Sequence, residues 1–234
     1  MNIPLSSRLK QCCAFIPKGA VVADIGCDHG YLSIYLLKNE IARQVIAADI
    51  NEMPLQSAVQ NAARFAVSDC ISFYLSDGAQ NIPRNFTHMV CAGMGADTII
   101  SILERAPWLK DERYTLILQC QSKTPTLRKY LWEQGYAIKR ETVLKDGRFL
   151  YTVMEAAYAP AVSFTLGHCW LPPALAASGS PYLEEYYRQV TTKLHRAING
   201  RKEQADPDMV TALHELENAP IYQTIKENAY DNCK

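Results

Sequence analysis

The stretch Val21–Tyr31, VVADIGCDHGY, decides the fold of this chain. Its first part, Val21–Ile25, is a short apolar run, long enough for one buried strand of a parallel sheet. Two glycines and two aspartates follow, and the apolar pattern then resumes at helical spacing from Leu32. The stretch therefore predicts a strand, a glycine turn and a helix.

The predicted turn is acidic, because Asp24 and Asp28 flank Gly26 and Gly30 closes it. Glycines in such a turn let the backbone pass close to a ligand. A pyrophosphate would need helix amides without a nearby carboxylate, so an acidic turn better suits a cationic ligand with amine and hydroxyl donors. S-adenosylmethionine, with its sulfonium, ammonium and ribose, is such a ligand. An ordinary strand, turn and helix would show the same pattern, so this stretch alone leaves both interpretations open.

The composition sets the class of protein. The 234 residues suffice for one domain of about 150 residues and a smaller second one. Lys and Arg total 24 and Asp and Glu total 24, so any nucleic-acid site must be local. The chain contains no signal-like or membrane-length apolar run, so we expect a cytoplasmic protein with no membrane partner. The eight cysteines lack zinc-site spacing, so we expect buried thiols and no metal.

Strands and helices alternate through the first two thirds of the chain. After the first strand we expect parallel strands at residues 44–50, 71–75, 88–92 and 114–119. A final pair of strands meets at Asp146-Gly147 and forms an antiparallel hairpin. This order is that of a Rossmann-like α/β class I methyltransferase sheet, and we place the methyltransferase domain at residues 1–158. The chain lacks the GxGxxG motif that would indicate a dinucleotide dehydrogenase.

Acidic residues also lie at the ends of the second and third expected strands. Asp49 lies 19 residues beyond Gly30, where a doubly wound fold holds ribose hydroxyls. Asp49 could also cap the next helix, and the two roles are compatible. Asp77 and Gly78 follow the third strand, where a nucleotide-type site faces the base, although a plain Asp-Gly turn explains this pair equally well.

The C-terminal third of the chain has a different character. Residues 157–180 are rich in proline and small residues, which is typical of a linker. Residues 182–204 then carry apolar side chains in steps of four and three, the seam of a coiled coil. A second, shorter seam follows a helix start at Asp206-Pro207. We expect a second domain, residues 159–234, with this linker and two antiparallel helices, and with the last residues frayed.

With these residues assembled, the chain resembles the TrmK-type tRNA (adenine-N1)-methyltransferases. The resemblance spans roughly residues 5–230, and its most specific parts are the DxGxDHxYL turn and the AGMG strand end. The stretches that carry it are ADIGCDHGYL (23–32), AADI (47–50), SDGAQNI (76–82), VCAGMGADTIISIL (90–103), LILQCQ (116–121), LRKYL (127–131) and DGRFLYTVM (146–154). The chain departs from the family at Ala96, commonly glycine, and at Cys120-Gln121, commonly Pro-Asn. Both departures concern the substrate side of the site.

The resemblance implies transfer of a methyl group from S-adenosylmethionine to N1 of adenosine 22 in the D-arm of tRNA, in bacteria. The expected cofactor-binding residues are Asp24, Gly26, Cys27, Asp28, Gly30, Tyr31, Asp49, Ile50, Asp77, Gly78, Ala92 and Gly93. Because ligands lie at the carboxyl ends of the strands, the expected catalytic residues are Asp28, His29, Gly93, Met94 and Gly95. His29 could also be an ordinary turn histidine.

Positive charge is concentrated in the second domain, where fifteen residues hold five cationic side chains. These are Arg188, Lys193, Arg196, Arg201 and Lys202. A solvated helix face would look the same, but we favour a surface that binds tRNA phosphates.

Three other functions remain open from the sequence. The chain could methylate another RNA site, or it could be a non-catalytic S-adenosylmethionine-binding scaffold with a helical interaction arm. A small-molecule methyltransferase is disfavoured, since a small substrate needs no additional helices. The intact glycine turn, Asp49 and AGMG end argue against lost catalysis. The sequence does not fix the oligomeric state, and a monomer is expected.

Overall fold

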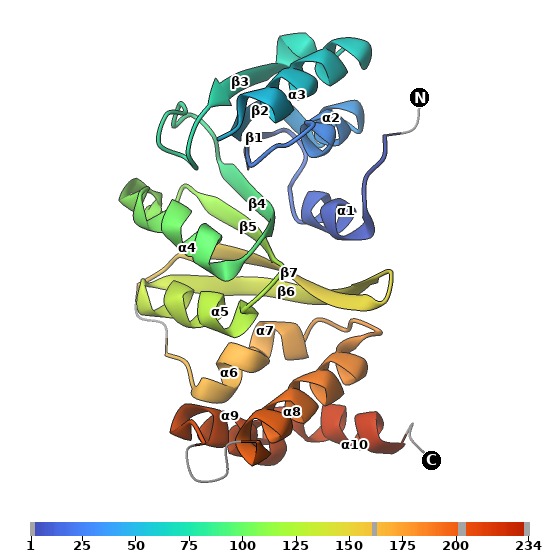
Figure 1. Ribbon diagram of the computed structural model, residues 1–234, viewed down its shortest axis with the longest axis vertical. Helices are drawn as coiled ribbons and strands as arrows, with labels where there is room; N and C mark the ends of the chain where they lie inside the picture. The colour runs from blue at the N-terminus through green and yellow to red at the C-terminus, as the bar shows by residue number, and fades with distance from the viewer. Residues whose placement is uncertain (1–2, 161–162, 201–204, 232–234) are drawn as a thin grey trace.

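The structure is a computed structural model that describes residues 3–160, 163–200 and 205–231. Seven strands in these residues form one sheet: β1 (Ala20–Ile25), β2 (Ala42–Asp49), β3 (Ile71–Leu75), β4 (His88–Met94), β5 (Thr115–Cys120), β6 (Tyr136–Asp146) and β7 (Phe149–Tyr158). Their order is β3-β2-β1-β4-β5-β7-β6 (Figure 1). Strands β1 to β5 are parallel, and β7 runs antiparallel to both of its neighbours. The predicted α/β sheet with its terminal hairpin is confirmed.

Helices cover both faces of the sheet (Figure 1). One face carries α1 (Ser7–Ala14), α2 (Tyr31–Lys38) and α3 (Glu52–Arg64), and the other carries α4 (Ala96–Glu104) and α5 (Thr124–Glu133). Short 3₁₀ turns lie at Ser68–Cys70, Pro107–Leu109 and Pro220–Tyr222. Every residue of β1 is buried, since successive side chains enter the cores on opposite faces: Val22 packs on the α1 side, Val21 and Ala23 on the α4 side.

The C-terminal part contains more helix than the sequence predicts. Its helices are α6 (Leu166–Trp170), α7 (Pro173–Ala176), α8 (Leu183–Asn199), α9 (Pro207–Asn218) and α10 (Gln223–Asp231). The two predicted helices are α8 and α9, whereas α6 and α7 lie in the expected linker. Helix α10 covers residues expected to fray, because Ile225 and Ala229 bury their side chains in the same core as α8. These helices form a bundle against β6 and not a hairpin that stands alone.

A buried arginine joins this bundle to the sheet. Arg128 of α5 has no exposed side-chain surface and pairs with Glu141 of β6, Nη2 to Oε1, at 2.6 Å. It also donates from Nη1 to the backbone carbonyls of Cys169 and Trp170, at 2.9 and 2.8 Å, and from Nη2 to the Tyr186 hydroxyl. Burial lowers the pKa of Arg128, but the Glu141 carboxylate outweighs this and raises it above its ordinary value. The guanidinium therefore stays charged and connects α5, β6, α6 and α8.

Candidate cofactor and substrate site

A cleft of about 500 Å³ opens where β1 and β4 end. This is the edge at which open α/β sheets bind their ligands. The predicted site residues that line it are Asp24, Gly26, Cys27, Asp28, His29, Tyr31, Ala92, Gly93 and Met94. Residues far apart in the sequence thus meet at one wall, because β1 and β4 are neighbours in the sheet.

The glycine turn is held in a conformation that few side chains permit. Gly26 has a φ of +71°, and a Cβ built on it would collide with the Met94 methyl group. Asp28 also has a positive φ, +50°, which aspartate tolerates better than most residues do. Its backbone N–H donates to Asp49 Oδ2 at 3.0 Å. The turn is therefore shaped both by glycine and by a carboxylate from the neighbouring strand.

Asp49 stands at the end of β2 and is 7% exposed. Its second oxygen, Oδ1, accepts from the backbone N–H of Asn51 at 2.9 Å. Asn51, and not Asp49, is the residue that precedes the first turn of α3. Asp49 does not line the cleft itself but ties the β1 and β2 loops together. A carboxylate has about four acceptor positions, so two of them remain for a ligand.

Asp24 is the buried acid that lines the cleft. Burial raises the pKa of its carboxyl to about 6, although the Ser33 hydroxyl, which donates to Oδ2 at 2.6 Å, lowers it, and Asp49 raises it further. A positive charge in the cleft would favour the ionised carboxylate. Burial also raises the pKa of the nearby Cys27 thiol, which keeps this side chain neutral.

His29 and Asp28 lie on the rim of the cleft. Their side chains are 51% and 70% exposed, and His29 Nε2 stands 3.6 Å from Asp28 Oδ1. The backbone of His29 is fixed from the other side, since its carbonyl accepts from Asn61 Nδ2 at 3.0 Å. The two side chains are thus held side by side at the mouth and remain open to a substrate.

The opposite rim is formed by a bulge in β4 at Gly93, which has a φ of +79°. Its N–H donates to Gln119 Oε1 at 3.0 Å, and Gln119 is fully buried. Gln121 lies beside Gly93 in the cleft, and its N–H donates to the Met94 carbonyl at 2.8 Å. Sequence reasoning missed Gln119, because a polar residue in an apolar strand is visible only as an exception to the pattern.

The two departures from the family pattern have different surroundings. Cys120 is buried, and its thiol donates to the Ser122 carbonyl at 2.9 Å, so it faces away from the cleft. Ala96 is fully buried in the first turn of α4. Gln121 is the departing residue that lines the cleft. The change from the family's pattern thus reaches the cleft through one amide side chain.

Several predicted site residues do not line the cleft: Gly30, Asp49, Ile50, Asp77, Gly78 and Gly95. Ile50 is 59% exposed, and the Asp77 carboxylate accepts from Arg105 Nη2 at 2.8 Å. A Cβ on Gly95 would meet the Ser122 hydroxyl at 3.0 Å, so Gly95 serves the packing of α4 against the β5 loop. The lining residues that sequence reasoning missed are Pro4, Ser6, Arg8, Leu9 and Leu32, together with Gln121.

A second hollow, which we call the basic groove, holds about 620 Å³ between α8 and the turn that joins β6 to β7. Its lining residues are Arg148, Leu150, Glu185, Arg188, Gln189, Thr192, Lys193 and Arg196. Three predicted RNA-binding residues therefore share this groove, and Arg148 from the hairpin joins them. The other two, Arg201 and Lys202, lie outside the described residues.

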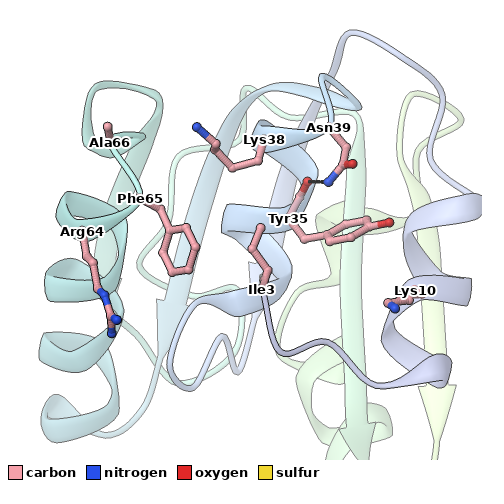
Figure 2. A pocket seen from close by; sticks show the side chains of 8 residues that line it. All are labelled: Ile3, Lys10, Tyr35, Lys38, Asn39, Arg64, Phe65 and Ala66. Atoms are coloured by element: carbon pink, nitrogen blue, oxygen red, sulfur yellow. Dashed lines mark hydrogen bonds between the residues drawn. The ribbon is translucent and has the colours of Figure 1, made fainter. Parts of the chain in front are cut away.

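A further cavity of about 480 Å³ lies at the opposite edge of the sheet, where α2 and α3 end. Figure 2 shows the Phe65 ring turned into the space between these helices. Lys10, Lys38 and Arg64 also line it, and none of the predicted site residues does. We refer to it below as the distal cavity.

Membrane spans and metal centres are both absent from the described part of the chain. No helix in the described ranges is both long and apolar enough to span a membrane. Within the same ranges, no three side chains of His, Cys, Asp or Glu gather closely enough to hold a metal ion.

The cysteines were expected to be buried thiols. Burial raises the pKa of the Cys13 and Cys91 thiols to about 12, whereas Cys70 is exposed, unlike that expectation.

Comparison with known proteins identifies the architecture around the cleft. A family model described as a methyltransferase domain matches residues 5–154. The tRNA (adenine(22)-N(1))-methyltransferase of Bacillus subtilis is 34% identical over 156 residues, which cover 66% of this chain and 66% of that protein. The match thus spans just under two thirds of this relative's length.

Solved structures resemble nearly the whole chain. The crystal structure of the B. subtilis M1A22 tRNA methyltransferase TrmK has a TM-score of 0.77 at 27% identity and covers 97% of this chain and 99% of its own. A putative tRNA (m1A22) methyltransferase of Streptococcus pneumoniae, in complex with S-adenosyl-L-methionine, has a TM-score of 0.80 at 25% identity, with 94% and 100% covered. The chain therefore belongs to the methyltransferase-domain family and, within it, to the TrmK type.

Proposed function

We propose that this protein transfers the methyl group of S-adenosylmethionine to N1 of adenosine 22 in tRNA. The observation that carries the proposal is the acidic cleft at the carboxyl edge of the sheet, in a chain whose relatives are named for this reaction. Residues 1–158 would bind the cofactor, and residues 159–234 would contact the tRNA. Its relatives and its substrate would place the reaction in the bacterial cytoplasm.

The residues of the cleft fit the cofactor. Asp24 and Asp28 would supply negative charge for the sulfonium and the ammonium, and Gly26 would let the backbone approach the cofactor. The free acceptor positions of Asp49 suit the two ribose hydroxyls at the end of β2. When bound, S-adenosylmethionine supplies an electrophilic methyl group on a positively charged sulfur.

The chemistry requires positioning more than proton transfer. N1 of neutral adenine carries an in-plane lone pair, so no strong base is needed, but the base must leave its stack to reach the cleft. As positive charge appears on the adenine ring, Asp28 would stabilise it, and His29 beside Asp28 would orient the ring. On the opposite rim Gly93 leaves room for the base, and the Gln121 amide is placed to hydrogen-bond its edge.

The basic groove is the surface that we propose for the tRNA backbone. Arg148, Lys193 and Arg196 project from two elements toward the same hollow, and phosphate contacts need such clustered cations. Phe149, 51% exposed beside Arg148, offers a ring on which an unpaired base can stack. Lys193 lies 5.6 Å from the centre of the Trp170 ring, which steadies its long side chain.

The test is methyl transfer to an unmodified tRNA transcript that has adenosine at position 22, with labelled cofactor and primer extension of the product. We expect incorporation and a primer-extension stop at that nucleotide, and neither in a matched transcript with guanosine there. A stop at another position would assign another RNA site. Cofactor binding without transfer to any tRNA would assign a scaffold.

Two substitutions test the placement of the substrate. His29→Ala and Gln121→Ala should each slow transfer by at least about tenfold with little change in cofactor affinity, since both side chains lie on the rim. Gly95→Val is a poorer test, because its side chain would press on Ser122. Full transfer activity in both rim variants would exclude this placement of the adenine.

A further inference from the structure

The turn that joins β6 to β7 lies between the cleft and the basic groove. Figure 1 shows this turn between α1 and the C-terminal helices. On one side, Asp146 Oδ2 lies 3.7 Å from Nη1 of Arg8, which lines the cleft. On the other side, Lys145 Nζ lies 2.9 Å from Oε1 of Glu185, which lines the groove. The hairpin therefore connects the two sites.

The two faces of β7 have different neighbours. Successive side chains of a strand point to opposite faces, so Phe149 and Tyr151 share one face and Leu150 lies on the other. Leu150 packs against the C-terminal helices and lines the groove. Farther along the strand, Val153 shares the face of the two rings and is buried in the core under α1. Phe149 and Tyr151, which we call the aromatic pair, extend this face beyond the core.

Each ring of the aromatic pair contacts an arginine from a different site. The guanidinium of Arg148, a groove residue, lies 4.9 Å from the centre of the Phe149 ring. The guanidinium of Arg8, a cleft residue, lies 5.5 Å from the centre of the Tyr151 ring. The two rings stand 6.3 Å apart, edge to face at 61°. A continuous series of cation and ring contacts therefore leads from the groove to the cleft.

The exposure and charge of this series suit a nucleic acid. Phe149 is 51% exposed and Tyr151 is half-buried. A single exposed ring is ordinary on a protein surface, but two adjacent rings with an arginine at each end are the combination that binds single-stranded nucleic acid. Asp146, the carboxylate beside the pair, faces Arg8, which offsets its charge. The surface is therefore open to a polyanion with flat bases.

We propose that the aromatic pair binds the unpaired nucleotides next to the target adenosine while that adenosine occupies the cleft. This inference deepens the proposed function and rests on it. A base that leaves its helix to enter an enzyme site deprives its two neighbours of a stacking partner. Phe149 and Tyr151 offer ring faces that replace this partner. Because every base has a flat face, the binding does not depend on which bases the neighbours are.

The test combines a change in the protein with a change in the RNA. The double variant Phe149→Leu with Tyr151→Leu keeps apolar bulk and removes the flat rings. Separate transcripts carry an abasic nucleotide directly before or directly after adenosine 22. With the parent protein, the abasic change on at least one side should lower kcat/KM for methyl transfer by at least about fivefold. The double variant should show a similar loss with unmodified tRNA, and the abasic change should add less than about twofold to it.

Three controls separate stacking from other effects. The conservative variants Phe149→Tyr and Tyr151→Phe should restore most of the activity lost with leucine. Phe164→Leu removes a ring that stacks on Trp132 at 5.1 Å and lines neither site, so it should leave transfer unchanged. Exchange of a neighbouring base for another base should change transfer by less than about twofold. Thermal unfolding checks that each variant keeps the fold.

Two further measurements decide the outcome. In the double variant, cofactor affinity by calorimetry and the slope of log tRNA affinity against log salt should match the parent, because stacking releases no counterions. If the parent methylates adenosine 22 but the losses from the abasic change and the double variant multiply, the inference is overturned and the proposed function stands. A fall in cofactor affinity would equally overturn the inference. If the parent transfers no methyl group to tRNA, the proposed function fails, and the inference fails with it.

Discussion

The cleft and the basic groove would recognise the ligands that we propose for them by different physical means. The cleft is lined mostly by short side chains and backbone groups. Asp24 in this lining, and Asp49, which accepts from the Asp28 N–H of the glycine turn, are buried and held by hydrogen bonds before any ligand arrives. The groove is built from long cationic side chains such as Lys193 and Arg196, whose charged ends remain in water. A single substitution in a preorganised site is expected to remove most of its affinity for the ligand. Each substitution on a charged surface removes only part of the affinity, and that affinity falls as the salt concentration rises.

The largest effect, on the free energy of unfolding, is expected at Arg128, which joins the C-terminal helices of the groove to the sheet that carries the cleft. Arg128→Met should lower the free energy of unfolding by about 3–5 kcal/mol, because the Glu141 carboxylate remains buried without its partner. Urea denaturation measures this loss. Arg113→Met, which removes an exposed pair with Asp111, should cost less than about 1 kcal/mol. Equal small losses in the two variants would show that the buried pair does not connect the regions.

A second prediction separates the cleft from the groove. Asp49→Ala removes the acceptor for Asp28 and Asn51 and the proposed ribose contact, and charged hydrogen bonds contribute about 1.5–3 kcal/mol each. Affinity for S-adenosylmethionine should fall by at least about tenfold in calorimetry, while tRNA binding is kept. Asp69→Ala, at an exposed aspartate near β3, should change neither. Unchanged cofactor affinity in Asp49→Ala would remove Asp49 from the site.

The third prediction concerns the groove, where substitutions should affect tRNA binding and not cofactor binding. Replacing Arg148, Lys193 and Arg196 together by glutamine should weaken tRNA binding and leave cofactor affinity unchanged. The slope of log affinity against log salt should become shallower by about two to three, one increment for each phosphate that no longer meets a cation. The full chain is needed, because shortening it to residue 159 would strip Arg128 of the Cys169 and Trp170 carbonyls.

A matched control for this variant comes from the distal cavity. Replacing Lys10, Lys38 and Arg64 by glutamine removes the same charge from the opposite edge of the sheet and should leave the salt slope as in the parent. If both triple variants lower the slope equally, total charge and not the groove governs tRNA binding.

The smallest effect concerns pH. The pKa of Asp24 is raised to about 6, and a cationic cofactor prefers its ionised form, so protons and cofactor compete below that pH. Affinity for S-adenosylmethionine should fall about fourfold between pH 7 and pH 5.5 and stay level above pH 7. Asp24→Asn should bind more weakly at pH 7 but with a flatter profile. An equally steep profile in this variant would assign the titration to another group.

The parts of the site that were predicted are those encoded locally. Asp24, Gly26 and Asp28 lie within five residues at the end of one strand, and Gly93 and Met94 end another, so the strand order alone brings them together. The parallel sheet and its hairpin were predicted for the same reason, since each strand shows its own apolar run.

The parts that were missed depend on tertiary contacts. Arg8 is not among the expected site residues, because nothing in its sequence neighbours reveals that α1 lines the cleft. Arg148 gains its place in the groove only when β6 and β7 bring it beside α8. In the expected linker, Leu171 and Leu175 become fully buried once they meet Tyr222, whose hydroxyl donates to the Leu171 carbonyl at 2.6 Å. Two of the prolines that suggest a linker, Pro172 and Pro173, instead start the short helix α7.

The Arg128 contacts also have a geometric consequence. The Arg128 guanidinium contacts β6, α6 and α8 from its own helix, α5. Because these contacts fix the C-terminal helices on the sheet, we expect the distance between the basic groove and the cleft to stay the same when a substrate binds. A polynucleotide anchored along the groove would then present the nucleotide that lies one fixed span away. The protein would then select its target base by the distance of that base from the RNA segment bound in the groove, with no need to read the neighbouring sequence.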